Sequence, residues 1–135
     1  MASFLFGVLG GFIAWVTTEI FVRPLIRFYD LRTETAKALA LYEDRFNPDP
    51  DASPPNPDWL EERRSVYQHC GASLVAFATS NSFLARLLQR IPLENFRYYV
   101  RSAGSNMQGL AETLPATQAS DYFRNKAVSA LKLWY

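Results

Sequence analysis

An apolar and almost uncharged segment at the N-terminus constrains this chain of 135 residues more than any other feature. Residues Ala2 to Val22 read ASFLFGVLGGFIAWVTTEIFV and contain one charged side chain, Glu19. About 20 helical residues cross a hydrocarbon core of about 30 Å, so the segment is long enough for one membrane span. It lacks the basic start of a secretory signal peptide, and bulky Trp15 and Phe21 stand where a cleavage site needs small residues. We therefore predict an uncleaved transmembrane helix, with a buried core helix as the alternative.

The basic residues around this segment predict its orientation. Arg23, Arg27, Arg32 and Lys37 follow the span, whereas no Lys or Arg precedes it. Because basic flanks remain on the cytoplasmic side, we expect the N-terminus outside and the rest of the chain in the cytoplasm. The single cysteine, Cys70, excludes a disulfide framework and is compatible with a reducing compartment.

Small side chains are spaced along one face of the predicted span. Gly7 and Gly11 form a G-x-x-x-G pair, and Ala14 and Thr18 continue the same face. Small residues let membrane helices approach closely, so we expect this face to pack on another membrane helix, either a second copy or a different protein. The competing interpretation is that glycine is simply frequent in membrane helices.

Three charged residues mark the end of the span: Glu19, Arg23 and Arg27. Glu19 precedes Arg23 by four residues, which is the favoured order for an ion pair on a helix. We expect an interfacial pair whose side chains extend toward the headgroups. The alternative is that a carboxylate at this depth lines the mouth of a pore or meets a basic partner.

Composition divides the chain into four parts. They are a transmembrane helix over residues 1–23, a stalk helix over 24–45, a proline-rich linker over 46–57 and a helical cytoplasmic domain over 58–135. Five of the eight prolines lie in the linker, a density that excludes helix and strand there. No segment alternates as a strand would. The predicted fold class is all-α, a single N-terminal transmembrane helix that continues into a small cytoplasmic helical domain.

Capping residues and apolar spacing predict the helices of the cytoplasmic domain. We expect Asp58 to cap the first helix and the polar run 79–82 to divide it into two. Residues 104–106 are expected to form a turn between two short helices, and Ser120 or Asp121 to cap the last helix. The predicted core positions are Phe28, Leu31, Leu39 and Tyr42 on the stalk, Leu60, Arg63, Tyr67, Cys70, Leu74 and Phe77 next, and Phe123, Ala127, Ala130, Leu131 and Trp134 on the last helix.

One arrangement resembles a catalytic motif. Arg64 and His69 have the R-x4-H spacing of HEPN-type ribonucleases, in which the arginine stabilises phosphate charge and the histidine transfers protons. The second motif position is Ser65, where that family usually has Asn, Asp or His. His69 is the single histidine, so one copy of the chain holds no histidine dyad. We favour a surface or packed histidine beside Cys70, and predict no enzymatic activity, no metal and no cofactor.

A basic and aromatic run lies in the middle of the cytoplasmic domain. We expect it to be the solvated side of packed helices, a contact for anionic headgroups or another partner, or an RNA-binding surface, in that order of preference. With 14 Lys and Arg against 13 Asp and Glu, the net charge of +1 argues against nucleic acid as a partner. The run comprises Arg86, Arg90, Arg97, Tyr98, Tyr99 and Arg101.

Two blocks of the sequence resemble small, uncharacterised single-pass membrane proteins of proteobacteria. The first, FVRPLIRFYDLRTETAKALALY, fits an R-P-L-x-x-F-x-x-L-R-x-E juxtamembrane pattern. The second, YQHCGASLVAFATSNSFLARLLQRI, has an L-x-A-F-A centre. This resemblance implies a topology and a place in the bacterial inner membrane, not a reaction. The overall plan, with Arg64 and His69, is also similar to membrane accessory proteins of RNA-targeting CRISPR systems, some of which assemble into pore-like rings.

The sequence therefore predicts a non-enzymatic, membrane-anchored helical protein. Its expected partners are membrane lipid and either further copies of itself or another membrane protein. A homo-oligomer is the simplest form, and a ring of such helices can enclose a pore. The alternatives are an accessory subunit of a larger membrane complex and an RNA-cleaving effector that uses Arg64 and His69.

Overall fold

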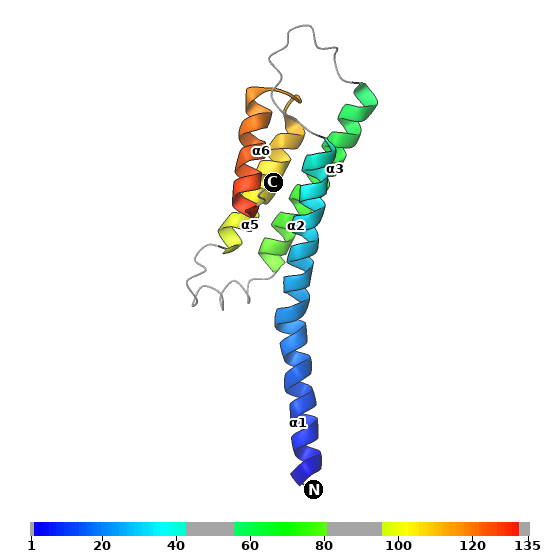
Figure 1. Cartoon of the computed structure of the whole chain (residues 1–135), viewed down its shortest axis with the longest axis vertical. Coiled ribbons are helices and arrows are strands. Elements are labelled where there is room, and N and C mark those ends of the chain that lie inside the picture. Colours follow the sequence, from blue (N-terminus) through cyan, green and yellow to red (C-terminus); the bar gives the residue numbers. More distant parts are fainter. Residues whose placement is uncertain (1, 43–55, 81–95, 133–135) are drawn as a thin grey trace.

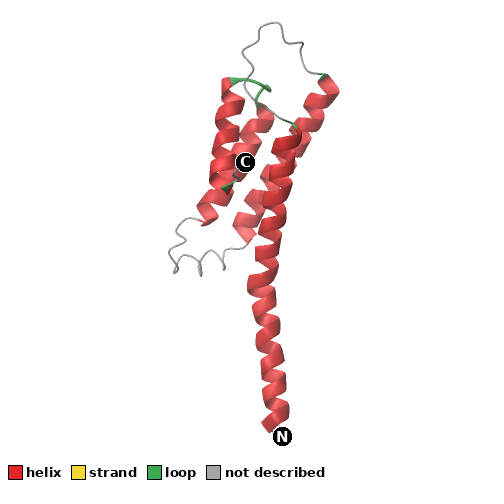
Figure 2. Cartoon of the chain, in the orientation of Figure 1, coloured by secondary structure: helices red, strands yellow, loops and turns green. Residues whose placement is uncertain are grey.

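The computed structural model describes residues 2–42, 56–80 and 96–132, and within these ranges every regular element is a helix (Figure 2). The all-α prediction is therefore confirmed for the described residues. The helix predicted to follow the polar run 79–82 and nearly all of the proline-rich linker lie outside them. In chain order the elements are α1 (Ala2–Thr17), the π-helical turn η1 (Thr18–Val22), α2 (Arg23–Leu41), α3 (Pro57–Ser80), α5 (Phe96–Glu112) and α6 (Gln118–Leu131).

The first three elements form one continuous rod, and its N-terminal part projects well beyond the other helices (Figure 1). The C-terminal part of the rod, α2, lies beside α3, and α5 packs between α3 and α6. Successive helices of this bundle run in opposite directions (Figure 1). The stalk predicted over residues 24–45 is thus helical over Arg23–Leu41, and its second half belongs to the bundle because Thr35, Ala38 and Leu39 are buried there.

The bundle core includes eight of the predicted apolar positions, but the five buried apolar residues of α5 were not among the predicted ones. Each helix buries a stripe at intervals of three and four residues, as expected for packed amphipathic helices. Phe28, Leu31, Phe123 and Ala130 are partly buried against this core, and Trp134 lies outside the described residues. The buried apolar residues are Ala38, Leu39, Tyr42, Tyr67, Cys70, Leu74, Phe77, Ala78, Val100, Ala103, Met107, Leu110, Ala111, Ala127 and Leu131.

An aromatic cluster lies at the end of the bundle from which the rod projects, which we call the base. Phe28 of α2 packs on Phe77 of α3 and Phe96 of α5, with ring centroids 6.0 Å and 4.7 Å apart. Edge-to-face and tilted contacts of this kind are favourable beyond the area they bury. The cluster sets the start of α5 and the end of α3 at the level of Phe28 on the rod.

A second aromatic cluster lies at the opposite, far end of the bundle. Tyr42 packs on Trp59 and Tyr67 of α3, with centroids 5.7 Å and 5.6 Å apart. Burial is the largest cause that raises the pKa of Tyr42, and the nearby negative charge of Glu62 raises it further. The clusters hold α2 against α3 at both ends, so the rod and the bundle are one packed unit.

Pro24 does not break the rod, and η1 explains why. A proline inside a helix lacks the N–H group, and its ring crowds the carbonyl group four residues earlier. Here the preceding turn is wider, because the Arg23 N–H donates to the carbonyl oxygen of Thr18, five residues back. The wider turn makes room for the proline ring, and α2 continues from it as a regular helix.

Two helices begin at caps other than the predicted ones. For α3, Asn56 Oδ1 accepts from the Asp58 N–H at 3.0 Å, and Pro57 in the first helical position fixes the required φ. For α6, Thr117 is the cap, since its hydroxyl accepts from the Ser120 N–H at 3.2 Å while the Ser120 hydroxyl accepts from the Thr117 N–H at 3.1 Å. This reciprocal capping box uses Ser120 as its partner and leaves Asp121 in the first turn.

The turn predicted at residues 104–106 is wrong, because α5 runs without interruption from Phe96 to Glu112. Gly104 faces Gly71 of α3 where the two helices cross. A Cβ atom on Gly104 would lie 2.8 Å from the Gly71 carbonyl oxygen, and one on Gly71 would lie 2.8 Å from the Gly104 carbonyl oxygen. The close approach explains the glycine, and the Asn106 side chain donates to the Ser102 carbonyl oxygen within the helix.

Candidate functional site

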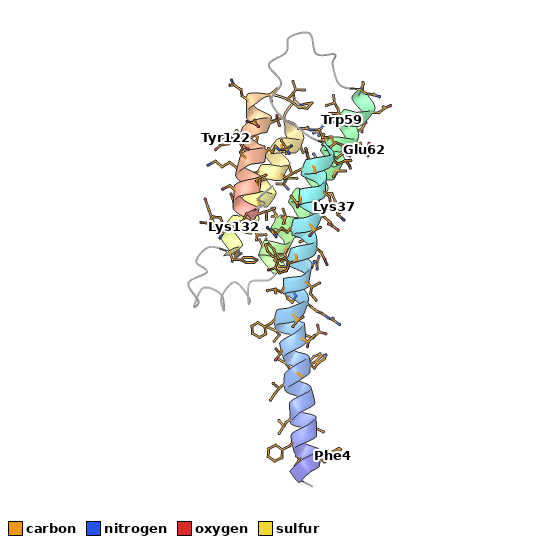
Figure 3. All side chains as sticks on the ribbon, in the orientation of Figure 1. Phe4, Lys37, Trp59, Glu62, Tyr122 and Lys132 are labelled. Atoms are coloured by element: carbon orange, nitrogen blue, oxygen red, sulfur yellow. The ribbon has the colours of Figure 1, made fainter. Side chains whose placement is uncertain are left out.

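The N-terminal part of the rod presents apolar side chains on every side. Among the residues from Phe4 to Val22, none is buried, and Phe4 and Phe6 are 77% and 75% exposed. The helix from Phe4 to Leu41 is long and apolar enough to cross a membrane. Figure 3 shows Phe4 near the tip, far from the bundle. The large exposed apolar residues of this segment are Phe4, Leu5, Phe6, Val8, Leu9, Phe12, Ile13, Trp15, Phe21 and Val22.

The predicted packing residues lie on one narrow face of this segment. At about 100° per residue, Gly7, Gly11, Ala14 and Thr18 fall within an arc of about 60°. A methyl group added at Gly7 or Gly11 would meet no described atom within 4 Å. The Thr18 hydroxyl donates to the Ala14 carbonyl oxygen at 2.9 Å, which satisfies this polar group inside the helix. The face is therefore open, nearly flat and without an unsatisfied hydroxyl.

The charged residues at the end of the apolar segment are arranged as a pair and a single cation. Arg23 Nη1 lies 3.0 Å from Glu19 Oε2, in the i,i+4 relation. Arg27 follows one turn later and is exposed. Both members of the pair belong to the stretch around η1, so the charges lie where the apolar surface gives way to the bundle.

The structure separates Arg64 and His69. Residues five apart on a helix lie about 140° apart around its axis. Arg64 Nη2 bonds Glu112 of α5 at 2.9 Å, and Gln68 Nε2 bonds the same carboxylate at 2.9 Å. The hydrogen bonds from Gln68 and then Arg64 lower the pKa of Glu112. Within one copy of the chain, the catalytic candidates therefore do not converge on one point.

His69 lies instead in a shallow groove on the other side of α3, against α2. Its neighbours in the groove include Glu34, Lys37 and the edge of Cys70. Cys70 is buried, and burial followed by the charge of Glu34 raises the pKa of its thiol. A buried thiol with a raised pKa is a poor nucleophile. Among the described residues, no group of three His, Cys, Asp or Glu side chains is close enough to hold a metal ion.

The described part of the basic and aromatic run lies on the first turns of α5. Arg97, Tyr98, Tyr99 and Arg101 are all exposed, and the two tyrosine rings contact each other edge to face at 5.8 Å. These four residues lie on the solvent-facing side of α5 at the base of the bundle, whereas Val100 is buried in the core. Arg86 and Arg90 lie outside the described residues.

Two arginines, Arg63 and Arg32, cap the ends of other helices, a role that was not predicted for them from the sequence. Arg63 is 1% exposed, and its guanidinium donates to the carbonyl oxygens of Leu110 and Thr113 at the end of α5. Arg32 donates to the carbonyl oxygens of Leu131 and Lys132 at the end of α6, at 3.1 Å and 2.8 Å. A cation is favourable at a helix C-terminus, where carbonyl groups lack helical partners. The sequence signal for a buried arginine at this position was that Arg63 lies within an apolar stripe.

Comparison with known proteins supplies no relative: no protein-family model, curated protein or solved structure matches the chain.

Proposed function

We propose that this chain is a non-enzymatic membrane-anchored protein, in which α1 and η1 span a lipid bilayer and the bundle is held on the cytoplasmic side. One observation carries the proposal. The core of the bundle includes no residue of α1 or η1, none of the described side chains of that segment is buried, and ten of its large apolar side chains are exposed. A soluble protein gains nothing from such a segment, because exposed apolar surface of this extent marks an interaction site.

The energetics favour lipid as the surroundings of this segment. Full burial of a large apolar side chain contributes about 1.5–3 kcal/mol, so ten partly exposed ones contribute on the order of 10–20 kcal/mol. The opposing term is Glu19, which costs a few kcal/mol at the centre of a bilayer. Glu19 is near the end of the segment and paired with Arg23, so this cost is smaller. The basic flank supports the orientation with the bundle in the cytoplasm, in a bacterial inner membrane.

Assembly through α1 forms the second part of the proposal. Gly7, Gly11, Ala14 and Thr18 offer a continuous face on which a second helix can approach closely. We favour a second copy of the chain as the occupant, and a ring of copies would enclose a pore lined near its cytoplasmic end by Glu19. An accessory subunit of a larger complex would use the same face against a different protein. The RNA-cleaving alternative receives less support, since Arg64 is engaged by Glu112.

Alkaline extraction and sizing in detergent test the two parts separately. The membrane part predicts that the full chain stays in the pellet after alkaline washing, and recovery in the supernatant would refute it. The assembly part predicts that Gly11→Leu reduces the oligomer to a smaller species. Val16→Leu is the matched control, because it adds bulk about 140° around the helix from Gly11. Equal sizes for both variants and the parent would exclude packing through the glycine face.

Two further measurements separate the alternatives. Ion leakage from liposomes that contain only this protein supports a pore, whereas tight liposomes support an anchor or an accessory subunit. The stoichiometry of the particle purified from its native membrane distinguishes self-assembly from a complex with other proteins. If His69→Ala abolished a cellular activity of the protein, the RNA-cleaving alternative would gain the support it lacks.

A further inference from the structure

We infer that the base of the bundle binds anionic lipid headgroups through Arg97, Tyr98, Tyr99 and Arg101, so that the bundle rests on the membrane surface. The inference rests on the proposed membrane anchor and assigns a second lipid contact to a different part of the chain. Three features support it: the distance of this surface from the apolar segment along the rod, the charges around it, and the chemistry of its side chains.

The height of the surface follows from the base cluster. Phe96, the first residue of α5, packs on Phe28 with centroids 4.7 Å apart. Phe28 is six residues beyond Val22, which places the start of α5 about 9 Å along the rod from the end of the apolar segment. The headgroup layer on one side of a bilayer is about 5–8 Å thick. Exposed Leu25 and Ile26 carry apolar surface along α2 toward the base. The first turns of α5 therefore reach the outer limit of the headgroups.

The charges of the described residues are unevenly distributed along the bundle. At the base, Arg27, Arg97 and Arg101 are exposed, Glu19 is paired with Arg23, and Asp30 is the remaining carboxylate. The far end carries most of the acidic side chains, at the start of α3, the end of α5 and the start of α6. Figure 3 shows Glu62 at that end, far from Phe4 near the N-terminal tip of the rod. The acidic residues of the far end are Asp58, Glu61, Glu62, Asp121 and Glu112, of which Glu112 is paired with Arg64.

This polarity fits an anionic membrane below the base and water beyond the far end. Arginine binds phosphate through two parallel hydrogen bonds, and basic residues near an anionic leaflet are attracted to it. Tyrosine rings favour the interface because one end is apolar and the hydroxyl group is polar. Tyr98 is 67% exposed, which a soluble bundle does not require, and its ring lies beside that of Tyr99. The surface thus combines the two side-chain types found at headgroup level.

Fluorescence quenching in bilayers of two compositions tests the inference. The full-length chain with Cys70→Ala carries a fluorophore at Thr79→Cys, at the base end of α3, or at Ala119→Cys, an exposed position in the first turn of α6 at the far end. It is reconstituted into phosphatidylcholine, with and without phosphatidylglycerol, that contains headgroup spin-labelled lipid. We expect stronger quenching at position 79 in the anionic bilayer and none at position 119.

Charge variants then identify the surface. Each arginine near an anionic leaflet changes the docking equilibrium about fivefold, so Arg97→Gln with Arg101→Gln is expected to lower it about 25-fold. The matched control is Lys37→Gln with Arg64→Gln, which removes two exposed cations from elsewhere and is expected to change nothing. Similar quenching in both bilayers, or equal effects of both pairs, would overturn the inference.

The outcome for the anchor is read separately. Flotation of the proteoliposomes through a density gradient reports insertion, whatever the lipid charge. Chains that do not float contradict the proposed anchor, whereas chains that float without composition-dependent quenching contradict only the headgroup contact. Binding of a single-stranded RNA in detergent that is lost in the Arg97 and Arg101 variant, with quenching unchanged, would show that the surface binds nucleic acid instead and would also overturn the inference.

Discussion

Replacement of Arg63 by methionine is predicted to destabilise the bundle far more than the same replacement at the adjacent Arg64. Arg63 is 1% exposed and donates to the carbonyl oxygens of Thr113 and Leu110, each at 3.1 Å. Arg64 is exposed, and its ion pair with Glu112 lies on the surface of the bundle. The two positions share a helix, a residue type and a substitution, so the comparison isolates the buried cap.

The magnitude follows from the bonds that are lost. A hydrogen bond from a charged donor contributes about 1.5–3 kcal/mol. In the methionine variant, the carbonyl oxygen of Leu110 still accepts a hydrogen bond from the Thr113 hydroxyl at 3.0 Å. The carbonyl oxygen of Thr113 loses its bond from Arg63, so most of the lost free energy comes from this bond. Removal of the cation from the end of α5 adds up to about 2 kcal/mol, and relief of the buried charge offsets part of the sum. We expect Arg63→Met to lower the free energy of unfolding by about 2–4 kcal/mol.

Urea unfolding followed by circular dichroism at 222 nm measures this difference. The loss corresponds to a midpoint lower by about 1–2 M urea. Arg63→Lys keeps the charge but not the forked geometry, and is expected to fall between the parent and the methionine variant. Equal midpoints for Arg63→Met and Arg64→Met would refute the assignment of Arg63 as the cap of α5.

Three further predictions concern the packing and titration of the bundle. Gly104→Ala is expected to destabilise it by about 1–2 kcal/mol, because overpacking at the crossing with Gly71 exceeds the gain in helix propensity; Gly10→Ala, with open space around it, serves as the control in the same urea titration. The thiol of Cys70, buried and with a raised pKa, is expected to react with iodoacetamide at least tenfold more slowly in the folded chain than in urea, and equal rates would contradict its place in the core. The pKa of Glu112 is lowered in the folded state, so its contribution to stability is present above the ordinary glutamate pKa of 4.5 and is lost as the pH falls through the lower folded value. On acidification below that pH, the free energy of unfolding should therefore fall less for Glu112→Gln than for the parent. Identical dependence of this free energy on pH in the two proteins would show that Glu112 does not contribute to acid sensitivity.

Apolar spacing predicts the core positions of α2, α3 and α6 because packing in a helical bundle has a simple period, but it misses the buried face of α5, where a turn was expected. Leu39, Cys70, Leu74 and Ala127 were expected on buried faces and are buried. The same spacing includes Arg63 in the stripe of α3, which is correct for its position. Its role as a cap depends on a distant helix end, and no local pattern encodes that distance.

The errors at Gly104 and at the helix starts have a common cause. A glycine beside polar residues usually marks a turn, but at Gly104 the missing side chain serves the close approach to Gly71. That partner is 33 positions away in the sequence and becomes visible only in the packed structure. At Asn56 and Thr117 several neighbouring residues are able to cap, and the choice depends on how each helix meets the bundle.

The candidate site is predicted in its parts and less in its arrangement. The apolar span, the ion pair between Glu19 and Arg23, and the exposed basic and aromatic residues of α5 all follow from sequence. The position of the α5 residues along the rod, relative to the apolar span, does not follow from sequence, because it depends on the contact between Phe28 and Phe96. The separation of Arg64 from His69 follows from helix geometry alone, and the pairing of Arg64 with Glu112 adds to it.

Protease protection of the two chain ends most directly tests the central proposal, that α1 and η1 span a membrane with the bundle on its cytoplasmic side. The full chain carries one epitope before Met1 and another after Tyr135, and trypsin is added to spheroplasts or to inverted inner-membrane vesicles. We predict that the N-terminal epitope is lost only in spheroplasts and the C-terminal epitope only in inverted vesicles. Digestion of the C-terminal epitope in intact spheroplasts, or release of the chain from both membranes by alkaline washing, would contradict the proposal.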